Sequence, residues 1–104
     1  MTTFYTHEEV SSHNGENGAA IWAIIDSYVL DLTAFIQHHP GSAKKIINRR
    51  NKSIDISSNF LDHFGHTVRS FREACRKYDR REEVVVLTFP EAKGEVHIIG
   101  KVKR

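Results

Sequence analysis

The sequence has a single cysteine, Cys75, among its 104 residues. One cysteine cannot form an internal disulfide, which excludes a disulfide-stapled secreted fold and favours a reducing compartment. The longest apolar stretches, 19–25 and 84–89, are far shorter than the roughly 20 residues that a membrane-spanning helix needs. No secretory signal follows Met1. We therefore expect a soluble, cytoplasmic protein without a membrane span.

Neither sign of charge is in large excess, because 15 basic residues face 13 acidic ones and give a net charge of +2. This balance is too even to argue for nucleic-acid binding. The hydrophobic share of 39% and the charged share of 27% are typical of a globular protein. The length predicts one domain, residues 1–104, which we expect to be a monomer.

Patterning predicts strands at both ends of the chain and helices between them. A short edge strand at 5–6 leads into a helix capped by Thr6, with Glu9 at the third position of a capping box, and ending near 14–15. Two apolar runs, 20–25 and 28–30, predict a buried hairpin. Further helices are expected at 34–38, 42–50, 55–61 and 68–77, and β-rich segments at 83–89 and 96–102. The fold class is therefore α+β.

Two histidines, His39 and His66, stand at the ends of predicted helices among aromatic and branched apolar side chains. Pro40 pushes His39 out of helical geometry, and Gly65 lets the backbone bend beside His66. Neutral imidazole is a common axial ligand of haem iron. Two such ligands on separate helix ends would clamp a flat apolar macrocycle.

The motifs around these histidines resemble those of the cytochrome b5 family. The family's His-Pro-Gly-Gly motif is matched by His39-Pro40-Gly41-Ser42, preceded by Asp31-Leu32-Thr33-Ala34-Phe35 in place of Asp-Leu-Thr-x-Phe. The segment of the second ligand is matched by Phe60-Leu61-Asp62-His63-Phe64-Gly65-His66-Thr67. Trp22 matches the core tryptophan. The resemblance spans about Tyr5 to Tyr78, with 96–102 as a closing strand.

This resemblance implies a small mixed sheet with two helix pairs that form a haem pocket. It implies a b-type haem (iron protoporphyrin IX) ligated by His39 and His66, and a one-electron carrier rather than an enzyme, fed by a flavin reductase and drained by an acceptor. Thr67 matches a family serine that meets a haem propionate. The candidate pocket residues are Phe35, Pro40, Gly41, Ile46, Phe60, Phe64, Thr67, Val68 and Phe71.

The sequence also departs from the family pattern. Ser42 replaces the second glycine, and the stretch between the two ligands is a few residues longer than usual, which predicts a bulge near 51–54. Residues 79–95 form a predicted insertion before the closing strand, and their alternating character favours an added strand or hairpin.

Three alternatives to the carrier remain open. His63 and His66 have a spacing that could bind zinc with His38 or His39. The same fold could serve as a haem or steroid-type ligand-binding module without a redox role. The chain could also be a carrier domain cut from a larger oxidoreductase, which the start at Met1 and the lack of a flavin-binding stretch argue against.

Basic residues follow both candidate ligands, where the family commonly has acidic ones. This predicts a basic haem-side surface that prefers an acidic redox partner. The alternative is an ordinary solvated helix face. The residues concerned are Lys44, Lys45, Arg49, Arg50, Lys52, Arg69 and Arg72.

Overall fold

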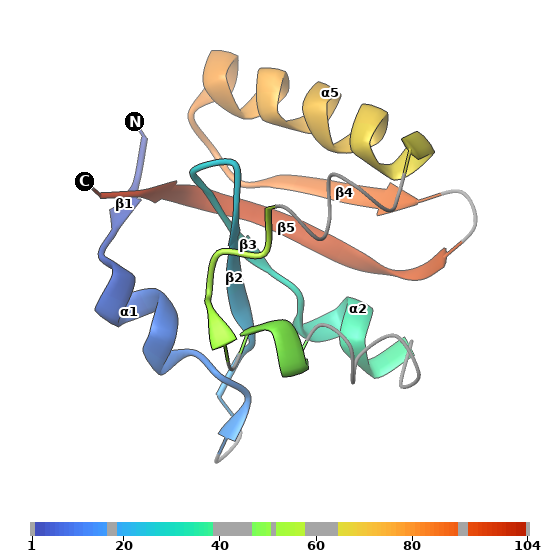
Figure 1. Ribbon diagram of the computed structural model, residues 1–104. Coiled ribbons are helices and arrows are strands. Elements are labelled where there is room, and N and C mark those ends of the chain that lie inside the picture. The colour runs from blue at the N-terminus through green and yellow to red at the C-terminus, as the bar shows by residue number, and fades with distance from the viewer. Residues whose placement is uncertain are drawn as a thin grey trace.

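The structure is a computed structural model that describes residues 2–16, 19–38, 47–50, 52–57, 65–89 and 92–103. Only the backbone is described at residues 38, 65–67, 89 and 92–93. The named elements are β1 (Phe4–Tyr5), α1 (His7–Ser12), β2 (Trp22–Ile25), β3 (Tyr28–Asp31), α2 (Thr33–His38), α5 (Gly65–Arg81), β4 (Val85–Phe89) and β5 (Ala92–Val102) (Figure 1).

The strands form one mixed, curled sheet around β5. One edge of β5 pairs antiparallel with β3, which in turn pairs with β2, and the other edge pairs with β4 and β1. Ile98 shows this central position, since it lies opposite Leu30 of β3 and Val85 of β4. Among the named strands, β1 runs parallel to its neighbour and the other pairs are antiparallel. The predicted α+β fold with a small mixed sheet is confirmed.

Both faces of the sheet carry buried apolar side chains. Successive side chains of a strand point to opposite faces, and here neighbouring residues are apolar on both. Ala23, Ile25 and Leu30 belong to one buried cluster, which we call the main core. Ile24 and Val29, each next to one of these residues in the chain, belong to a second cluster, which we call the small core. Helix α5 contributes to the main core and helix α1, through Val10, to the small core.

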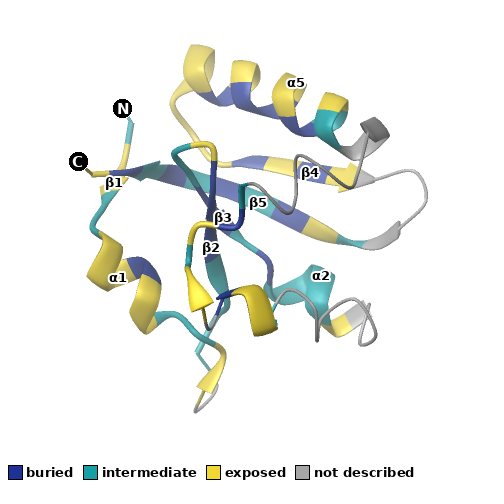
Figure 2. Cartoon of the chain, in the orientation of Figure 1, coloured by how far each residue is buried: buried dark blue, intermediate teal, exposed yellow. Residues whose placement is uncertain are grey.

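Helix α5 covers the sheet with an apolar stripe of helical spacing. Phe71, Ala74, Cys75 and Tyr78 are buried, and the opposite side of the helix is exposed (Figure 2). Burial of a large side chain such as Phe71 contributes about 1.5–3 kcal/mol. The helix was expected at 68–77 but begins at Gly65 and ends at Arg81. It extends past the predicted end because Tyr78 continues the buried stripe.

Other predicted elements are confirmed with shifted ends. The capping box of Thr6 and Glu9 is present, and α1 ends at Ser12 rather than near 14–15. The strand expected at 83–89 is β4, which pairs with β5 as a hairpin. Residues 79–81 were placed in the predicted insertion but belong to α5.

The prediction that a helix begins at Asp55 is wrong. Asp55 forms a parallel bridge with Ile24, and the Ile24 N–H donates to the Ile54 carbonyl at 2.8 Å. The Ile56 N–H donates back to the Ile24 carbonyl at 2.9 Å. This bridge covers the outer edge of β2, where unpaired backbone groups would otherwise face solvent. Helical structure starts at Ser57, and the rest of the predicted helix lies outside the described residues.

Candidate functional site

Hydrogen bonds of Asp31 and Thr33 hold the start of α2, the helix that leads towards His39. The Asp31 carboxylate accepts from the Thr33 N–H at 3.0 Å and from the Thr33 hydroxyl at 2.5 Å. The Thr33 hydroxyl oxygen accepts in turn from the Ile21 N–H at 2.9 Å. The Asp-Leu-Thr motif therefore caps the start of α2 and ties it to the strands beside it.

The body of α2 packs on the main core and against the start of β5. Phe35 and Ile36 are half-buried and contact the main core. Gly94 of β5 has φ +100°, and a Cβ there would lie 2.8 Å from the Phe35 Cα and 3.1 Å from the Ala34 carbonyl oxygen. Glycine permits both this backbone conformation and this close approach. The β4–β5 hairpin therefore helps to set the position of α2.

The second candidate ligand lies in the first turn of α5. Gly65, His66 and Thr67 form this turn, whose N–H groups have no partner within the helix. Val68, the next residue, is half-buried. Phe71 is 0% exposed and meets the Tyr28 ring edge to face, with centroids 6.1 Å apart. The partial positive charge of the helix N-terminus suits an anionic group such as a carboxylate.

The described part of the chain places α2 and α5 on the same face of the sheet. Phe35 from α2 and Phe71 from α5 belong to or pack against the same main core. In the view of Figure 1, the end of α2 and the first turn of α5 lie on the same side of the molecule. The half-buried Phe35, Ile36 and Val68 offer apolar surface on both helices, which fits a flat apolar group.

The predicted site residues are described to different extents. Phe35 and Val68 are half-buried, and Phe71 is fully buried within the core. His66 and Thr67 are placed by their backbone in α5. The others lie outside the described residues: His39, Pro40, Gly41, Ile46, Phe60 and Phe64.

The prediction that Arg50 belongs to an exposed basic surface is wrong. Its side chain is only 7% exposed. Nε donates to the Trp22 carbonyl at 2.7 Å. Nη2 donates to the carbonyls of Val10, Ser11 and His13 at 2.7, 2.9 and 2.9 Å. Burial lowers the pKa of the Arg50 guanidinium from its ordinary value, yet an arginine stays charged in proteins.

Arg50 thus fastens the segment 47–50 to the C-terminal end of α1 and to β2. The carbonyls at that helix end have no partners within the helix, and a cation there also meets the negative end of the helix dipole. The sequence around Arg50 gives one indication that its side chain faces the protein interior. Arg50 lies three residues after the half-buried Ile47, so both side chains share a face of a helix.

The other members of the predicted basic surface have mixed outcomes. Arg49, Lys52 and Arg69 are exposed. Arg72 is exposed and lies 3.7 Å from the Asp26 carboxylate. Lys44 and Lys45 lie outside the described residues.

The described residues do not favour a metal site or a reactive thiol. Among them, no group of three or more histidine, cysteine or acidic side chains could hold a metal ion. The zinc alternative stays a prediction, because His39 and His63 lie outside them. Burial raises the pKa of the Cys75 thiol to about 12, so this side chain stays protonated. None of the helices described is long and apolar enough to cross a membrane.

Comparison with known proteins gives a consistent result. Residues 6–102 match the profile of the cytochrome b5-like haem/steroid binding domain. The chain is 38% identical over 65 residues to a cytochrome b5 of Sus scrofa, covering 62% of this chain and 45% of that protein. It is 34% identical over 77 residues to a cytochrome b5 of Drosophila melanogaster, covering 74% and 53%.

A longer relative also matches. The chain is 32% identical over 88 residues to a probable Delta(5) fatty acid desaturase C of Dictyostelium discoideum, covering 84% of this chain and 18% of that protein. The chain thus spans about half the length of the two cytochromes b5 and about a fifth of the desaturase. No solved structure matches it at a significant level.

Proposed function

Because the chain belongs to the family of cytochrome b5-like haem/steroid binding domains, we propose that it is a one-electron carrier with a b-type haem held between His39 and His66. The observation that carries this proposal is the placement of α2 and α5. The helix that leads into His39 and the helix that contains His66 pack on one face of the sheet around the same main core.

The described residues indicate what each part of the site would do. Phe35 and Val68 would cover the macrocycle, and Phe71 would support that wall from within the core. Thr67, in the first turn of α5, would meet a propionate at the positive end of the helix. The remaining candidate contacts are Pro40, Gly41, Ile46, Phe60 and Phe64. A haem iron with two imidazole ligands has no open position, so the chemistry that it supplies is one-electron exchange.

The visible absorption spectrum of the protein with added hemin tests this proposal. We expect a sharpened Soret band and, after reduction with dithionite, resolved α and β bands, which are typical of two strong axial nitrogen ligands. A spectrum that stays that of free hemin would contradict the proposal, and metal analysis for zinc at His63 and His66 would then follow.

A second candidate function is a haem or steroid-binding module without a redox role, because the family description includes both ligands. The two functions differ in whether a bound haem can be oxidised and reduced repeatedly. A carrier should pass repeatedly between oxidised and reduced spectra without loss of haem. A steroid-binding module should bind a steroid, measured by calorimetry, and should show no bis-imidazole spectrum with hemin.

As a carrier, the protein would not be an enzyme itself and would act as a monomer between a flavin reductase and an acceptor enzyme in the cytoplasm. The similarity to a probable fatty acid desaturase makes desaturases the acceptors to test first. The exposed Arg69 of α5 favours a partner with an acidic surface. Electron transfer to a basic partner should be slow at low ionic strength, and a rate that fell steeply with added salt would contradict this preference.

A further inference from the structure

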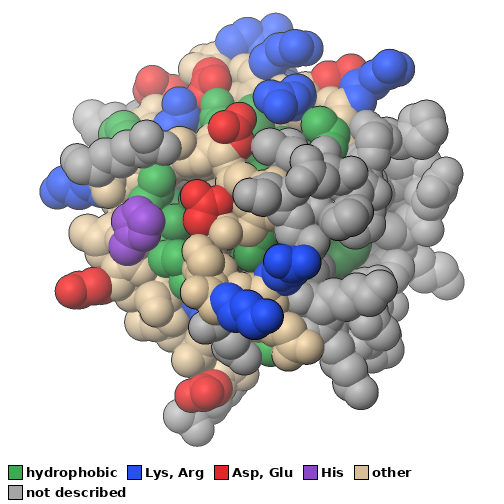
Figure 3. Space-filling view, viewed as in Figure 1, with side chains coloured by type: hydrophobic (Ala, Val, Ile, Leu, Met, Phe, Trp, Pro, Cys, Tyr) green, Lys and Arg blue, Asp and Glu red, His purple; other side chains and the backbone are tan. Residues whose placement is uncertain are grey.

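The solvent-facing side of α5 carries a ridge of four basic residues: Arg69, Arg76, Lys77 and Arg80. The last three follow Arg69 by seven, eight and eleven residues. This spacing places all four on the side of the helix opposite the buried Phe71 and Tyr78 (Figure 2). We call these four residues the α5 ridge. From Arg69 to Arg80 it spans about 16 Å at 1.5 Å per residue. Figure 3 shows Lys and Arg side chains gathered over this helix, with acidic side chains among them.

The charges of the α5 ridge lack ion-pair partners among the described residues, unlike those of neighbouring basic residues. Neighbouring basic residues do have partners, since Arg72 lies 3.7 Å from Asp26 and Arg81 lies 3.9 Å from Glu83. Within the part of the chain that the structure describes, no ion pair or hydrogen bond involves a side chain of the α5 ridge. Cations that share one side of a helix repel one another, and an acidic surface that covers them reduces this repulsion.

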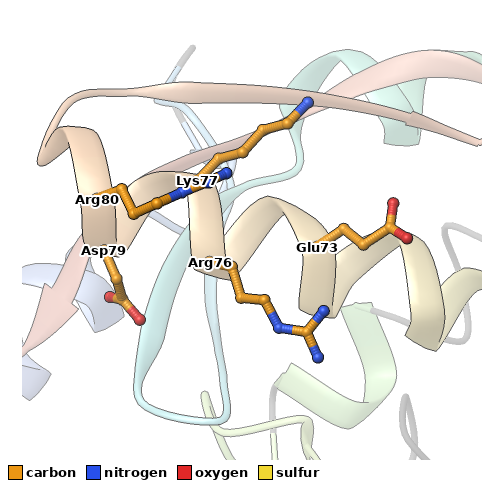
Figure 4. Close-up of a pocket in the computed structure, with 5 residues that line it drawn as sticks. All are labelled: Glu73, Arg76, Lys77, Asp79 and Arg80. Atoms are coloured by element: carbon orange, nitrogen blue, oxygen red, sulfur yellow. The ribbon is translucent and has the colours of Figure 1, made fainter.

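The shape of this surface suits a macromolecule. A shallow, open depression of about 550 Å³ lies along α5, and the lining side chains that the structure describes, drawn in Figure 4, belong to this helix. They are Glu73, Arg76, Lys77, Asp79 and Arg80. A depression this open to solvent does not enclose a small molecule, whereas ligand pockets bury most of their ligand.

The chemistry favours a protein over a membrane. Phe71, Ala74, Cys75 and Tyr78 of α5 are buried in the main core, so these apolar side chains are not available to enter a lipid layer, as an interfacial helix requires. Arginine fits carboxylates in a planar, two-bonded geometry. Glu73, exposed in the middle of the α5 ridge, adds one carboxylate to the four cations, and a protein partner can match this mixed pattern of charge.

We propose that the α5 ridge docks an acidic surface of a partner protein. The identification of that partner as a redox enzyme rests on the proposed carrier function, whereas the docking itself does not. This arrangement reverses the acidic docking surface common in the family.

The test measures binding of fluorescein-labelled oligoglutamate peptides by fluorescence anisotropy at low ionic strength, with and without hemin. An extended peptide spans about 3.3 Å per residue, so affinity should rise with length up to about six residues and then level off. The triple variant Arg69→Gln, Arg76→Gln, Arg80→Gln should bind the hexapeptide about tenfold more weakly, since exposed ion pairs are individually weak.

The matched control is the triple variant Arg49→Gln, Lys52→Gln, Lys103→Gln, which removes three charges from exposed positions outside α5. It should keep at least most of the affinity. Equal losses in both variants, or no loss in the α5 variant, would overturn the proposal. So would tighter, α5-dependent binding to phosphatidylserine vesicles than to the peptide. Peptide binding that persists in a protein unable to bind hemin would keep the docking surface and remove the carrier function.

Discussion

Arg50 and Val10 are 40 positions apart in the sequence, yet Arg50 Nη2 donates to the Val10 carbonyl oxygen at 2.7 Å. Three further carbonyls, those of Ser11, His13 and Trp22, accept from the same guanidinium. One side chain therefore holds together the end of α1, the start of β2 and the segment between the two candidate ligands. A buried cation with this many partners is costly to remove, because each carbonyl loses a charged donor.

Replacing Arg50 with methionine should lower the free energy of unfolding by about 2–4 kcal/mol, since four carbonyls would lose a charged donor. The carbonyls of Val10 and His13 would keep only the backbone N–H groups of His13 and Trp22. Urea denaturation followed by tryptophan fluorescence measures this change, because Trp22 lies at the site. The control is Arg49→Met, at an exposed neighbour, which should change stability by no more than about 0.5 kcal/mol. Equal effects of the two substitutions would show that the hydrogen bonds of Arg50 contribute nothing.

Gly94→Ala should both destabilise the protein and speed the loss of hemin. The new Cβ would lie 2.8 Å from the Phe35 Cα, at a residue with φ +100°, so α2 and β5 must move apart. We expect a loss of about 1–3 kcal/mol, typical of a strained backbone position. Hemin dissociation, measured by transfer to apomyoglobin, should accelerate because α2 leads into His39.

The control for this glycine is Gly15→Ala, which has φ +82° and whose Cβ would meet the Ile21 side chain rather than backbone. It should destabilise the fold without changing the rate of hemin loss. If the two variants lost hemin at the same rate, the hairpin would have no particular role in positioning α2.

The free energy of unfolding should fall at high pH because of the ionisation of Tyr28. Burial, and then the hydrogen bond that its hydroxyl donates to the Asp79 carboxylate at 2.7 Å, raise the Tyr28 pKa well above the usual value of 10.0. The unfolded chain loses this proton near pH 10 while the folded chain keeps it, so this contribution to stability is present below pH 10 and is lost as pH rises above it.

Phenolate absorbance measures this titration directly. The last ionisation step of the native protein should be missing in Tyr28→Phe, and its stability should decline less steeply above pH 10. If the variant kept that last step, the high-pH ionisation would belong to another residue.

Mutation can distinguish the two candidate ligands, His39 and His66, from a neighbouring histidine that is not a ligand. His39→Ala and His66→Ala should each abolish the six-coordinate spectrum with hemin, leaving a five-coordinate spectrum or no bound haem. His63→Ala should keep the six-coordinate spectrum, since His63 is a neighbour of the proposed ligand and not a ligand itself. An unchanged spectrum in both His39→Ala and His66→Ala would show that the ligands are assigned wrongly.

Local sequence spacing determined much of the fold. The two apolar runs at 20–25 and 28–30 predicted the β2–β3 hairpin, and Thr6 with Glu9 predicted the cap of α1. These features depend on neighbours within a few residues, so they can be read without knowing the rest of the structure. The motifs at His39 and His66 likewise pointed to the family that residues 6–102 match. They could not place those side chains in space.

Only the tertiary structure decided which residues meet across long separations. The spacing of Arg50 from Ile47 indicates a shared helix face, but not the four carbonyls, those of Val10, Ser11, His13 and Trp22, that accept from Arg50. Nothing near Asp55 indicates that Ile24 offers a free strand edge. The same holds for Gly94 against Phe35, and for α2 and α5 on a single core. The sequence determined the local elements because their hydrogen bonds close within a few residues. The tertiary structure decided the rest because burial and hydrogen bonding there depend on partners far along the chain.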